Sequence, residues 1–460
     1  MKRILIANRG EIARRVIRSA RALGLETVAV YSDADAGALH VSDADQAIAI
    51  GPAPARLSYL NAEAVLNAAQ LSGADAVHPG YGFLSENADF AQAVKDAGMI
   101  WIGPDPETLR SMGDKQRARE IARAAGVPVV PGSERFGDTV TAETLLAAAQ
   151  TVGYPLLVKA AAGGGGIGMR RVDGPETLVD AVRTTQSLAA RAFGDGTVFL
   201  ERFVPRARHI EVQVFGFGDG NAVHLYERDC SLQRRFQKVI EESPAPGLPD
   251  AKRARMADAA IALCAATKYR GAGTVEFIVD ADSFDFYFLE MNTRIQVEHA
   301  VTEMVTGVDL VAMQIDFARG QLTGMEQDAI AVEGHAIECR LYAEDPLRKF
   351  QPSPGVLEEL SLPHEGPALR VDCGYRTGDN VTPYYDPMLA KLIASGATRS
   401  EAIAGALRAL DQIRVQGPKT NSAFLAACLG NEAFGKGDVH TGFIDASGDA
   451  LLKSKERNEI

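Results

Sequence analysis

The segment Phe288-Leu-Glu-Met-Asn-Thr-Arg-Ile-Gln-Val-Glu-His299 gathers metal-type and anion-type side chains in one short stretch of the chain. If residues 288–293 form a strand, side-chain alternation places Glu290 and Asn292 on the same face. Carboxylate and amide oxygens suit a hard divalent cation such as Mg²⁺. A solvated edge strand would explain an isolated Glu-x-Asn pair. It does not explain a whole segment of such side chains in an apolar context, where unpaired charges are costly.

The same segment continues with candidates for anion binding and for proton transfer. Arg294 and Gln296 keep the two-residue period as far as the strand persists, and they are placed to hold a small oxyanion beside the metal. Glu298 follows them as a candidate base. The segment therefore predicts a metal-dependent site that handles an anion.

Length and composition indicate a globular protein of two to four domains, with 460 residues, 46% hydrophobic and 23% charged. The net charge of −12 argues against a general nucleic-acid surface. The chain has no apolar run of about eighteen residues, and its N-terminal apolar stretch is too short for a signal peptide. Five cysteines without a C-x-x-C pair suit reduced thiols. We therefore expect a cytoplasmic protein that binds neither membrane nor nucleic acid.

The first hundred residues alternate short apolar runs with helical patterns, which predicts a parallel α/β layer. The turn Asn8-Arg9-Gly10-Glu11 lacks the G-x-G-x-x-G pattern, so we infer no NAD site. A boundary is expected near residues 128–132, followed by a small α/β unit. From residue 203 onward, aromatic and β-branched runs predict a largely antiparallel sheet. A helix is expected over Glu401–Ile413, and the chain end from Lys453 is expected to fray.

A strand that ends in Lys159 leads into the glycine run 163–166, then Ile167, Gly168 and Met169. Consecutive glycines let backbone N–H groups turn toward a phosphate, and the lysine adds a point charge. The pattern is not a P-loop. A flexible hinge explains a bare glycine run equally well, but the preceding lysine favours a phosphate-covering lid.

Three further segments carry charged side chains that we weigh as candidates for the same site. The run Arg228–Glu242 is by default a solvated helix face, although Gln233 and Lys238 would complement an oxyanion site at Arg294. Glu276 lies in an apolar strand, as a second metal-ligand candidate or as part of an exposed strand face. The loop with His78, Tyr81 and Glu86 is explained well by a turn, and Arg340 lies in a strand-like segment that is unremarkable by itself.

Together, these segments resemble the biotin carboxylase family of ATP-grasp enzymes, in order over essentially the whole chain. The matching segments are Ile6-Ala-Asn-Arg-Gly-Glu-Ile-Ala13, His78-Pro-Gly-Tyr-Gly-Phe-Leu-Ser-Glu-Asn87, Met112-Gly-Asp-Lys115, the glycine run, Glu227-Arg-Asp-Cys-Ser-Leu-Gln-Arg-Arg235, Glu290 to His299, Glu338-Cys-Arg340 and Pro383-Tyr-Tyr-Asp-Pro-Met388. So many long motifs in register are highly specific.

The resemblance implies an α/β and α+β fold of the ATP-grasp type. It would have an N-terminal Rossmann-like pre-ATP-grasp domain, a small mobile lid domain and a C-terminal antiparallel-sheet domain. The implied divisions are an N-terminal domain over 1–113, a lid region over 114–203, a catalytic domain over 204–330, a C-terminal domain over 331–445 and a flexible tail over 446–460.

The resemblance also implies roles for single residues. Those that would contact ATP are Lys115, Lys159, Gly163, Gly164, Gly165, Gly166, Met169, His209 and Phe236. Glu201, with the hinge backbone through Val204, would receive the adenine, and Gln233 would lie near the ribose. Glu276, Glu290 and Asn292 would bind one or two Mg²⁺ or Mn²⁺ ions.

The chemistry implied by the resemblance runs through bicarbonate and biotin. Lys238, Arg294, Gln296 and the Val297 backbone would hold bicarbonate. Glu298 would remove its proton, so that bicarbonate attacks the γ-phosphate of ATP to give carboxyphosphate. This would yield CO₂ and phosphate, and the phosphate would take the proton from the ureido nitrogen of biotin. Arg340 would stabilise the biotin enolate as it attacks CO₂, and Tyr81 would line the biotin site.

Three positions depart from the family pattern. Ile167 stands where many relatives carry a basic residue, Phe236 replaces a common His or Asn near the nucleotide, and Ala300 replaces the usual Pro after Glu298-His299. None of the three removes a residue assigned to bond-making.

The chain lacks the Ala-Met-Lys-Met motif of biotin carriers, because its only Met-Lys is Met1-Lys2. We therefore expect a separate biotin carboxyl carrier protein and carboxyltransferase subunits, or a longer subunit of which this is the first domain. A homodimer is usual for such proteins. Two alternatives remain: an ATP-grasp ligase that activates another carboxylate, and a catalytically weak scaffold that binds a carrier. The final carboxyl acceptor, whether an acyl-CoA or urea, does not follow from the sequence.

Overall fold

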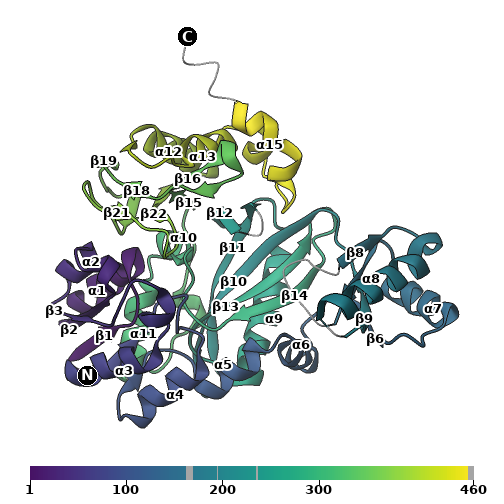
Figure 1. Ribbon diagram of the computed structural model, residues 1–460, viewed down its shortest axis with the longest axis horizontal. Coiled ribbons are helices and arrows are strands. Elements are labelled where there is room, and N and C mark those ends of the chain that lie inside the picture. Colours follow the sequence, from purple (N-terminus) through teal and green to yellow (C-terminus); the bar gives the residue numbers. More distant parts are fainter. Residues whose placement is uncertain (162–168, 194, 235–236, 454–460) are drawn as a thin grey trace.

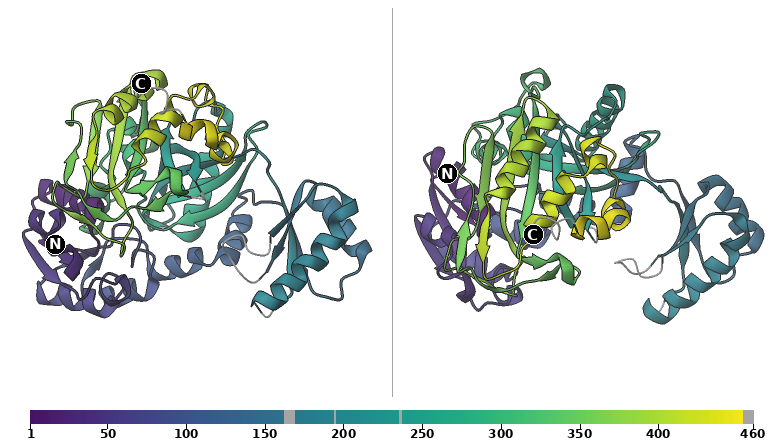
Figure 2. Two further views of the ribbon diagram at one scale, coloured as in Figure 1. Left: turned by 45° about the horizontal axis from the view of Figure 1, so that its top comes forward. Right: turned by 90° about the horizontal axis from the view of Figure 1, so that it is seen from above.

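The structure is a computed structural model that describes residues 1–161, 169–193, 195–234 and 237–453 (Figure 1). The chain forms an N-terminal unit, a small lid that projects from the rest of the molecule, and a large sheet that unites the remainder (Figures 1 and 2). No helix in these described ranges combines the length and the apolar character that crossing a membrane requires.

The N-terminal unit is built on five parallel strands in the order β3-β2-β1-β4-β5. The strands are β1 (Arg3–Ile6), β2 (Glu26–Tyr31), β3 (Gln46–Ala49), β4 (Ala76–His78) and β5 (Ile100–Trp101). Helix α1 (Gly10–Ala22) covers one face and α3 (Ala62–Leu71) and α4 (Ala88–Asp96) cover the other, because Ile4 and Leu5 alternate toward the two cores. The predicted parallel α/β layer is confirmed.

The lid is a four-stranded antiparallel sheet in the order β6-β9-β7-β8. Its strands are β6 (Gly132–Phe136), β7 (Leu156–Ala160), β8 (Met169–Val172) and β9 (Val198–Arg202), with helices α7 (Ala142–Val152) and α8 (Leu178–Phe193) packed on it. Helix α6 (Lys115–Ala124) packs Ala118 and Ala122 into the core of the large sheet rather than of the lid. The lid sheet therefore starts at Gly132, later than the implied boundary at 113/114.

The large sheet has eight antiparallel strands in the order β14-β13-β10-β11-β12-β15-β22-β20. They are β10 (Ala207–Phe217), β11 (Ala222–Arg234), β12 (Gln237–Ser243), β13 (Arg270–Asp280), β14 (Phe286–Asn292), β15 (His335–Tyr342), β20 (Leu369–Cys373) and β22 (Met388–Gly396). The pairing of β12 with β15 joins the segments 204–330 and 331–445 in one sheet. The predicted antiparallel sheet is confirmed.

The two faces of this sheet differ in character. Helix α9 (Asp250–Thr267) packs on the apolar face of β10, and α12 (Arg399–Asp411) and α13 (Ser422–Leu429) pack on that of β15 and β22. The opposite face carries buried polar side chains and is covered by α10 (His299–Thr306). Where a strand is regular, every second residue points to this polar face, which holds the candidate site.

The chain end differs from the flexible tail implied for 446–460. Helix α15 (Phe443–Lys453) covers the first part of that range, because Phe443, Ile444 and Leu451 are buried in the C-terminal core. The residues from 454 onward lie outside the described residues.

Candidate active site

The polar side chains of the 288–299 segment gather on the face of the large sheet that α10 covers. Strand β14 ends at Asn292, a loop follows, and α10 begins at His299. Glu298 immediately precedes the helix and is only 2% exposed. The partial positive charge of the helix N-terminus favours an ionised carboxylate there.

An extra residue in β14 decides which face Glu290 occupies. The register pairs Glu290 with Glu276 but leaves Leu289 without a partner, so that Phe288 and Glu290 lie on opposite faces. Phe288 packs into the apolar core, whereas Glu290 turns toward Glu276. Asn292 lies on the same polar face, and its Nδ2 donates to Glu276 Oε1 over 2.8 Å. The prediction that Glu290 and Asn292 share a face is confirmed.

The oxygens of Glu276, Glu290 and Asn292 fit a hard divalent cation. His209 Nε2 lies 2.8 Å from Glu276 Oε2. Burial alone would raise the pKa of Glu276, but Lys238 and His209 hold that pKa well below its usual range. An ionised carboxylate that faces a second carboxylate and an amide is the donor set that Mg²⁺ or Mn²⁺ takes. The assignment of these residues as metal ligands stays a prediction.

A second bulge directs Lys238 into the site. The register pairs Leu232 with Ile240 and Gln233 with Lys238, which leaves Val239 unpaired on β12. In a regular strand Lys238 and Ile240 would share a face. Because of the extra residue, Ile240 packs in the apolar core while Lys238 turns to the polar face.

Lys238 is the central cation of the site. Its Nζ lies 2.7 Å from Glu211 Oε2, 3.0 Å from Glu276 Oε1 and 2.5 Å from Glu298 Oε1. Burial would lower the pKa of Lys238, but Glu211 and Glu298 hold it well above its usual value. The described parts of the Arg228–Glu242 run thus lie on two antiparallel strands, so the default interpretation as a solvated helix face is wrong.

Glu298 is held between two cations. Its Oε1 accepts from Lys238, and its Oε2 accepts from Arg340 Nη2 over 2.8 Å. Burial alone would raise the pKa of the Glu298 carboxyl, but Lys238 and then Arg340 hold it well below its usual range. Glu298 is therefore ionised near neutral pH and has the protonation state that a base needs.

Arg294 and Gln296 reach the site from the loop rather than from a continuing strand. Gln296 Nε2 donates to Glu276 Oε1 over 2.8 Å. Arg294 Nη2 donates to Asn292 Oδ1, and Arg294 Nε donates to Glu86 Oε2, each over 3.0 Å. The two-residue period is expected only as far as the strand persists, and it does not extend to these two residues because β14 ends at Asn292. Both side chains nevertheless contact the predicted metal ligands.

The sequence does not single out three buried charged residues that support these side chains. Arg228 Nε donates to Glu211 Oε1 over 2.6 Å, and its Nη2 donates to Gln296 Oε1 over 3.1 Å. Lys391 Nζ donates to the Val297 carbonyl over 2.8 Å. Glu211 and Lys391 each interrupt an apolar strand segment, and that interruption was the available signal.

Two of the predicted nucleotide-binding residues, Lys159 and Glu201, form an ion-pair cluster in which the lid contacts α6. Lys159 Nζ donates to Glu201 Oε1 over 2.6 Å, and Arg119 Nη1 of α6 lies 3.0 Å from Glu201 Oε2. Val204 follows β9 and is buried. Lys159 and Glu201 thus share one polar cluster at the inner end of the lid, and their roles toward ATP stay predictions.

The other predicted nucleotide contacts are divided between the sheet and the lid. Gln233 Nε2 lies 2.7 Å from His209 Nδ1, and Lys115 Nζ lies 3.2 Å from Glu290 Oε2. Met169 begins β8 with an exposed side chain. The remaining predicted contacts and two of the departures from the family pattern, Ile167 and Phe236, lie outside the described residues: Gly163, Gly164, Gly165, Gly166, Ile167 and Phe236.

A cavity of about 490 Å³ opens beside Arg340, between the N-terminal unit and the large sheet. Its walls include Arg294, Val297 and Tyr81, the residue that the resemblance assigns to biotin. The Tyr81 hydroxyl donates to Glu11 Oε1. The cavity therefore borders two cations of the site, Arg294 and Arg340.

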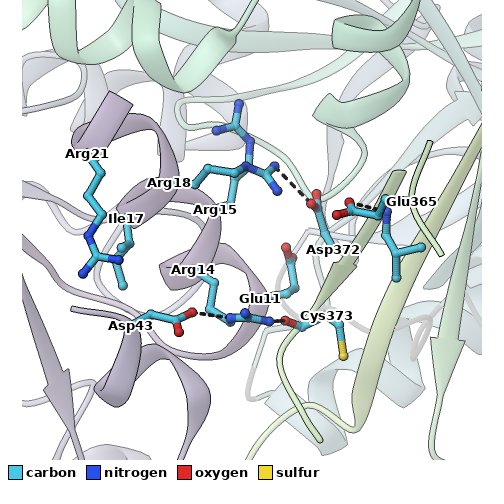
Figure 3. A pocket seen from close by; sticks show the side chains of 11 residues that line it. Glu11, Arg14, Arg15, Ile17, Arg18, Arg21, Asp43, Glu365, Asp372 and Cys373 are labelled. Atoms are coloured by element: carbon cyan, nitrogen blue, oxygen red, sulfur yellow. Dashed lines mark hydrogen bonds and ion pairs between the residues drawn. The ribbon is translucent and has the colours of Figure 1, made fainter. Parts of the chain in front are cut away.

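Another cavity, of about 390 Å³, lies between α1 and β20 (Figure 3). Its basic side chains face acidic partners: Arg14 Nε lies 2.5 Å from Asp43 Oδ2, and Arg18 Nη2 lies 3.2 Å from Asp372 Oδ1 (Figure 3). None of the predicted catalytic residues lines it. We interpret this second cavity as a polar contact between α1 and β20, in which basic side chains are paired with acidic ones, and not as a reaction site.

Three family models match the chain in succession. Residues 1–109 match "Biotin carboxylase, N-terminal domain", residues 114–324 match "Carbamoyl-phosphate synthase L chain, ATP binding domain", and residues 338–446 match "Biotin carboxylase C-terminal domain". The chain is 48% identical over 445 residues to Biotin carboxylase 1 of Bacillus subtilis, which covers 97% of this chain and 98% of that protein. It is also 50% identical over 454 residues to the mitochondrial methylcrotonoyl-CoA carboxylase subunit alpha of Oryza sativa. That match covers 99% of this chain but spans only 61% of the rice subunit.

Solved structures agree with these matches. A biotin carboxylase–β-γ-ATP complex from Campylobacter jejuni superposes with a TM-score of 0.87 at 44% identity and covers 97% of this chain and 98% of that one. A biotin carboxylase domain dimer of Hydrogenobacter thermophilus 2-oxoglutarate carboxylase, in complex with MgADP, ADP and bicarbonate, gives a TM-score of 0.86 at 41% identity. It covers 98% of both chains.

Proposed function

The chain belongs to the biotin carboxylase family, and we propose on that premise that it uses ATP and bicarbonate to carboxylate the biotin of a carrier protein. The observation that carries the proposal is the buried Glu298 carboxylate, held between Lys238 and Arg340 beside an oxygen-rich cluster. This arrangement offers a base, an anion clamp and metal ligands beside a cavity that Arg294 and Arg340 line.

The first step is proton removal from bicarbonate. Lys238, Arg294, Gln296 and the Val297 backbone bind the anion, and its proton passes to an oxygen of Glu298. The freed oxygen attacks the γ-phosphorus of ATP, and ADP leaves as carboxyphosphate forms. A bound Mg²⁺ or Mn²⁺ neutralises charge on the phosphoryl oxygens.

The second step transfers the carboxyl group to biotin. Carboxyphosphate separates into CO₂ and phosphate, and the phosphate takes the proton of the biotin ureido nitrogen. The Arg340 guanidinium stabilises the enolate oxygen while the ureido nitrogen attacks CO₂. Tyr81 and the cavity beside Arg340 support this placement of biotin. A closed lid would limit hydrolysis of the unstable intermediate.

Nucleotide binding is assigned to the lid and the adjacent sheet. Lys115, Lys159 and His209 would hold ATP, and Glu201 with the hinge backbone through Val204 would receive the adenine. The cluster of Lys159, Glu201 and Arg119 supports this assignment, since it lies where the lid meets α6. The glycine run would cover the phosphates from the lid. We keep the division of the chain at 113/114, 203/204 and 330/331 as part of the proposal.

The partner proteins are part of the same proposal. A biotin carboxyl carrier protein would supply the biotin, and a carboxyltransferase would pass the carboxyl group to an acyl-CoA. The match to methylcrotonoyl-CoA carboxylase α subunits supports an acyl-CoA system. A homodimer is supported by the dimeric Hydrogenobacter relative. A cytoplasmic location stays a prediction.

The alternatives are less well supported. A ligase for another carboxylate does not need Arg340 beside the base, and a scaffold does not need an ionised, buried Glu298. The test is transfer of labelled bicarbonate to free biotin in the presence of Mg-ATP. Acid-labile label on biotin would support the proposal. Label on another acceptor, or none with nucleotide bound, would favour the first or second alternative.

A further inference from the structure

Two buried carboxyl groups face each other beneath the candidate site. Glu241 of β12 and Glu338 of β15 are directly opposite in the antiparallel register, and both are 0% exposed. Opposed residues of neighbouring strands have Cβ atoms about 4.5–5.5 Å apart, so like charges at such positions repel. Neither carboxyl group has a role in the proposed reaction.

The hydrogen bonds of this pair are incomplete. None of the four carboxyl oxygens has a hydrogen-bond partner of acceptable geometry among the described residues. Glu241 Oε1 lies 2.6 Å from Arg340 Nη2 as an ion pair, whereas Glu338 forms no ion pair within the described ranges. Buried polar atoms are almost always satisfied, so the pair requires an explanation.

The cations near the pair are already shared with other acids. Lys391 Nζ donates to the Val297 carbonyl and lies 3.4 Å from Glu11 Oε2 and 3.6 Å from Asp372 Oδ2. Lys238 serves three other carboxylates, as described above. Two ionised carboxylates at 241 and 338 would therefore lack sufficient neighbouring positive charge.

The remaining neighbours do not supply that charge. On α10, which covers this face, His299 lies near Glu303, and Glu303 is held by Arg15 and Arg370 at 2.8 and 2.6 Å. On β22, the residue paired with Glu338 is the apolar Ile393. A proton on one of the two carboxyl groups removes one of the two negative charges and supplies a hydrogen-bond donor for the other carboxyl group.

We propose that Glu241 and Glu338 share one proton that resides on Glu338, and that the remaining charge on Glu241 positions Arg340 for the biotin step. The proposal rests on the function proposed above. Arg340 Nη2 contacts both Glu241 at 2.6 Å and Glu298 at 2.8 Å. When Glu298 accepts the proton of bicarbonate it loses its charge, and its hold on Arg340 weakens. Glu241 keeps the guanidinium in place at the moment when Arg340 must meet the enolate.

The pKa directions support this distribution of charge. Burial raises the pKa of Glu241 to about 7, although Arg340 opposes the rise. Burial raises the pKa of Glu338 well above its usual value, and Lys391 does not reverse the shift. Glu338 is therefore the member that keeps its proton to higher pH.

The test compares Glu241→Gln with Glu338→Gln in two assays. Glutamine has the shape of a protonated glutamate, so Glu338→Gln should leave both activities within about 3-fold of the unmodified protein. Glu241→Gln should lower biotin-stimulated ADP release by roughly 10- to 100-fold while bicarbonate-dependent ADP release without biotin changes less than about 3-fold. Glu242→Gln is the matched control, because Glu242 is buried on the same strand but pairs with Arg399 at 2.6 Å on the other face.

Equal losses in Glu241→Gln and Glu338→Gln would overturn the assigned proton position. Loss of the biotin-independent activity in Glu241→Gln, but not in Glu242→Gln, would overturn the role through Arg340. Infrared difference spectra against the unmodified protein test the proton without any activity. A protonated-carboxyl band at neutral pH should vanish in Glu338→Gln, and its persistence would contradict the proposal. If the unmodified protein never carboxylates biotin, the proposed function fails, while the infrared result still decides the shared proton.

Discussion

Replacing Lys238 with methionine removes the ammonium that three buried carboxylates share. Its Nζ lies 2.7 Å from Glu211, 3.0 Å from Glu276 and 2.5 Å from Glu298. Breaking a buried ion pair costs about 3–5 kcal/mol, because the remaining charge is left uncompensated. Arg228 still holds Glu211 at 2.6 Å, so we expect a loss of about 3 kcal/mol in the free energy of unfolding, measured in urea.

The same substitution changes the protonation of the base. Burial favours the neutral form of Glu298, and Lys238 is the strongest of the neighbours that lower its pKa. Without Lys238 the pKa of Glu298 rises, so the base becomes protonated at a higher pH. The acid limb of the pH–rate profile therefore moves to higher pH. Loss of a charge-assisted hydrogen bond to bicarbonate, about 1.5–3 kcal/mol, lowers kcat/KM for bicarbonate by roughly 10- to 150-fold.

The assay is bicarbonate-dependent ADP release, with kcat and KM determined for bicarbonate and for ATP across a pH series. Lys252→Met is the control, because Lys252 pairs at 2.9 Å with the exposed Asp285, and such pairs contribute about 0–1 kcal/mol. The control should match the unmodified protein. The reasoning is refuted if Lys238→Met keeps both its kcat/KM for bicarbonate and the position of its acid limb.

Four further outcomes are expected. Glu298→Gln should bind nucleotide normally in a direct binding assay but lose carboxylation; near-normal turnover would remove it as the base. Lys391→Met frees the Val297 carbonyl and should raise the KM for bicarbonate several-fold with the KM for ATP unchanged, whereas a parallel rise in both would indicate general damage. Because burial raises the pKa of Glu241 to about 7, this carboxyl group binds more protons in the folded state than in the unfolded state between about pH 4.3 and 7. Its contribution to the free energy of unfolding therefore falls as pH rises through that window, so the difference in the free energy of unfolding between the unmodified protein and Glu241→Gln should change with pH in that direction, and identical slopes would contradict this. Chelation of divalent metal should abolish ADP release, and Glu290→Gln should raise the Mg²⁺ concentration for half-maximal rate; an unchanged requirement would exclude it as a ligand.

The two-residue alternation of side chains predicts the candidate site only where the strand is regular. The shared face of Glu290 and Asn292 follows from alternation within β14. The bulge at Leu289 cannot be predicted from alternation. It places the core residue Phe288 and the site residue Glu290 on opposite faces of the sheet. The period also stops at Asn292, so Arg294 reaches the site by a loop that alternation cannot describe.

The charge run around Lys238 illustrates a second limit. Dense alternating charge commonly marks a solvated helix, but the described residues of this run lie on β11 and β12, and a bulge at Val239 turns Lys238 inward. The partners Glu211 and Glu276 come from other strands, and strand register across the sheet is set by tertiary packing. The opposition of Glu241 and Glu338 has the same origin.

The order of the elements follows more directly from the sequence. Alternating strand and helix patterns predict the N-terminal parallel layer, since each apolar run has the length of a buried strand. The helix α15 (Phe443–Lys453) near the chain end does not follow from the sequence pattern, because it is ordered by packing against the C-terminal core. Specific motifs in register over the whole chain connect it to a family, whereas the residue pairs that tune each pKa need the fold.

The most direct measurement is steady-state ADP release with Mg-ATP and bicarbonate, with and without free biotin. The proposed chemistry predicts turnover that requires bicarbonate and rises when biotin is added, because biotin consumes the CO₂ formed beside Arg340. ATP turnover that responds to an amine or amino acid but not to biotin, or nucleotide binding without any biotin response, would contradict it.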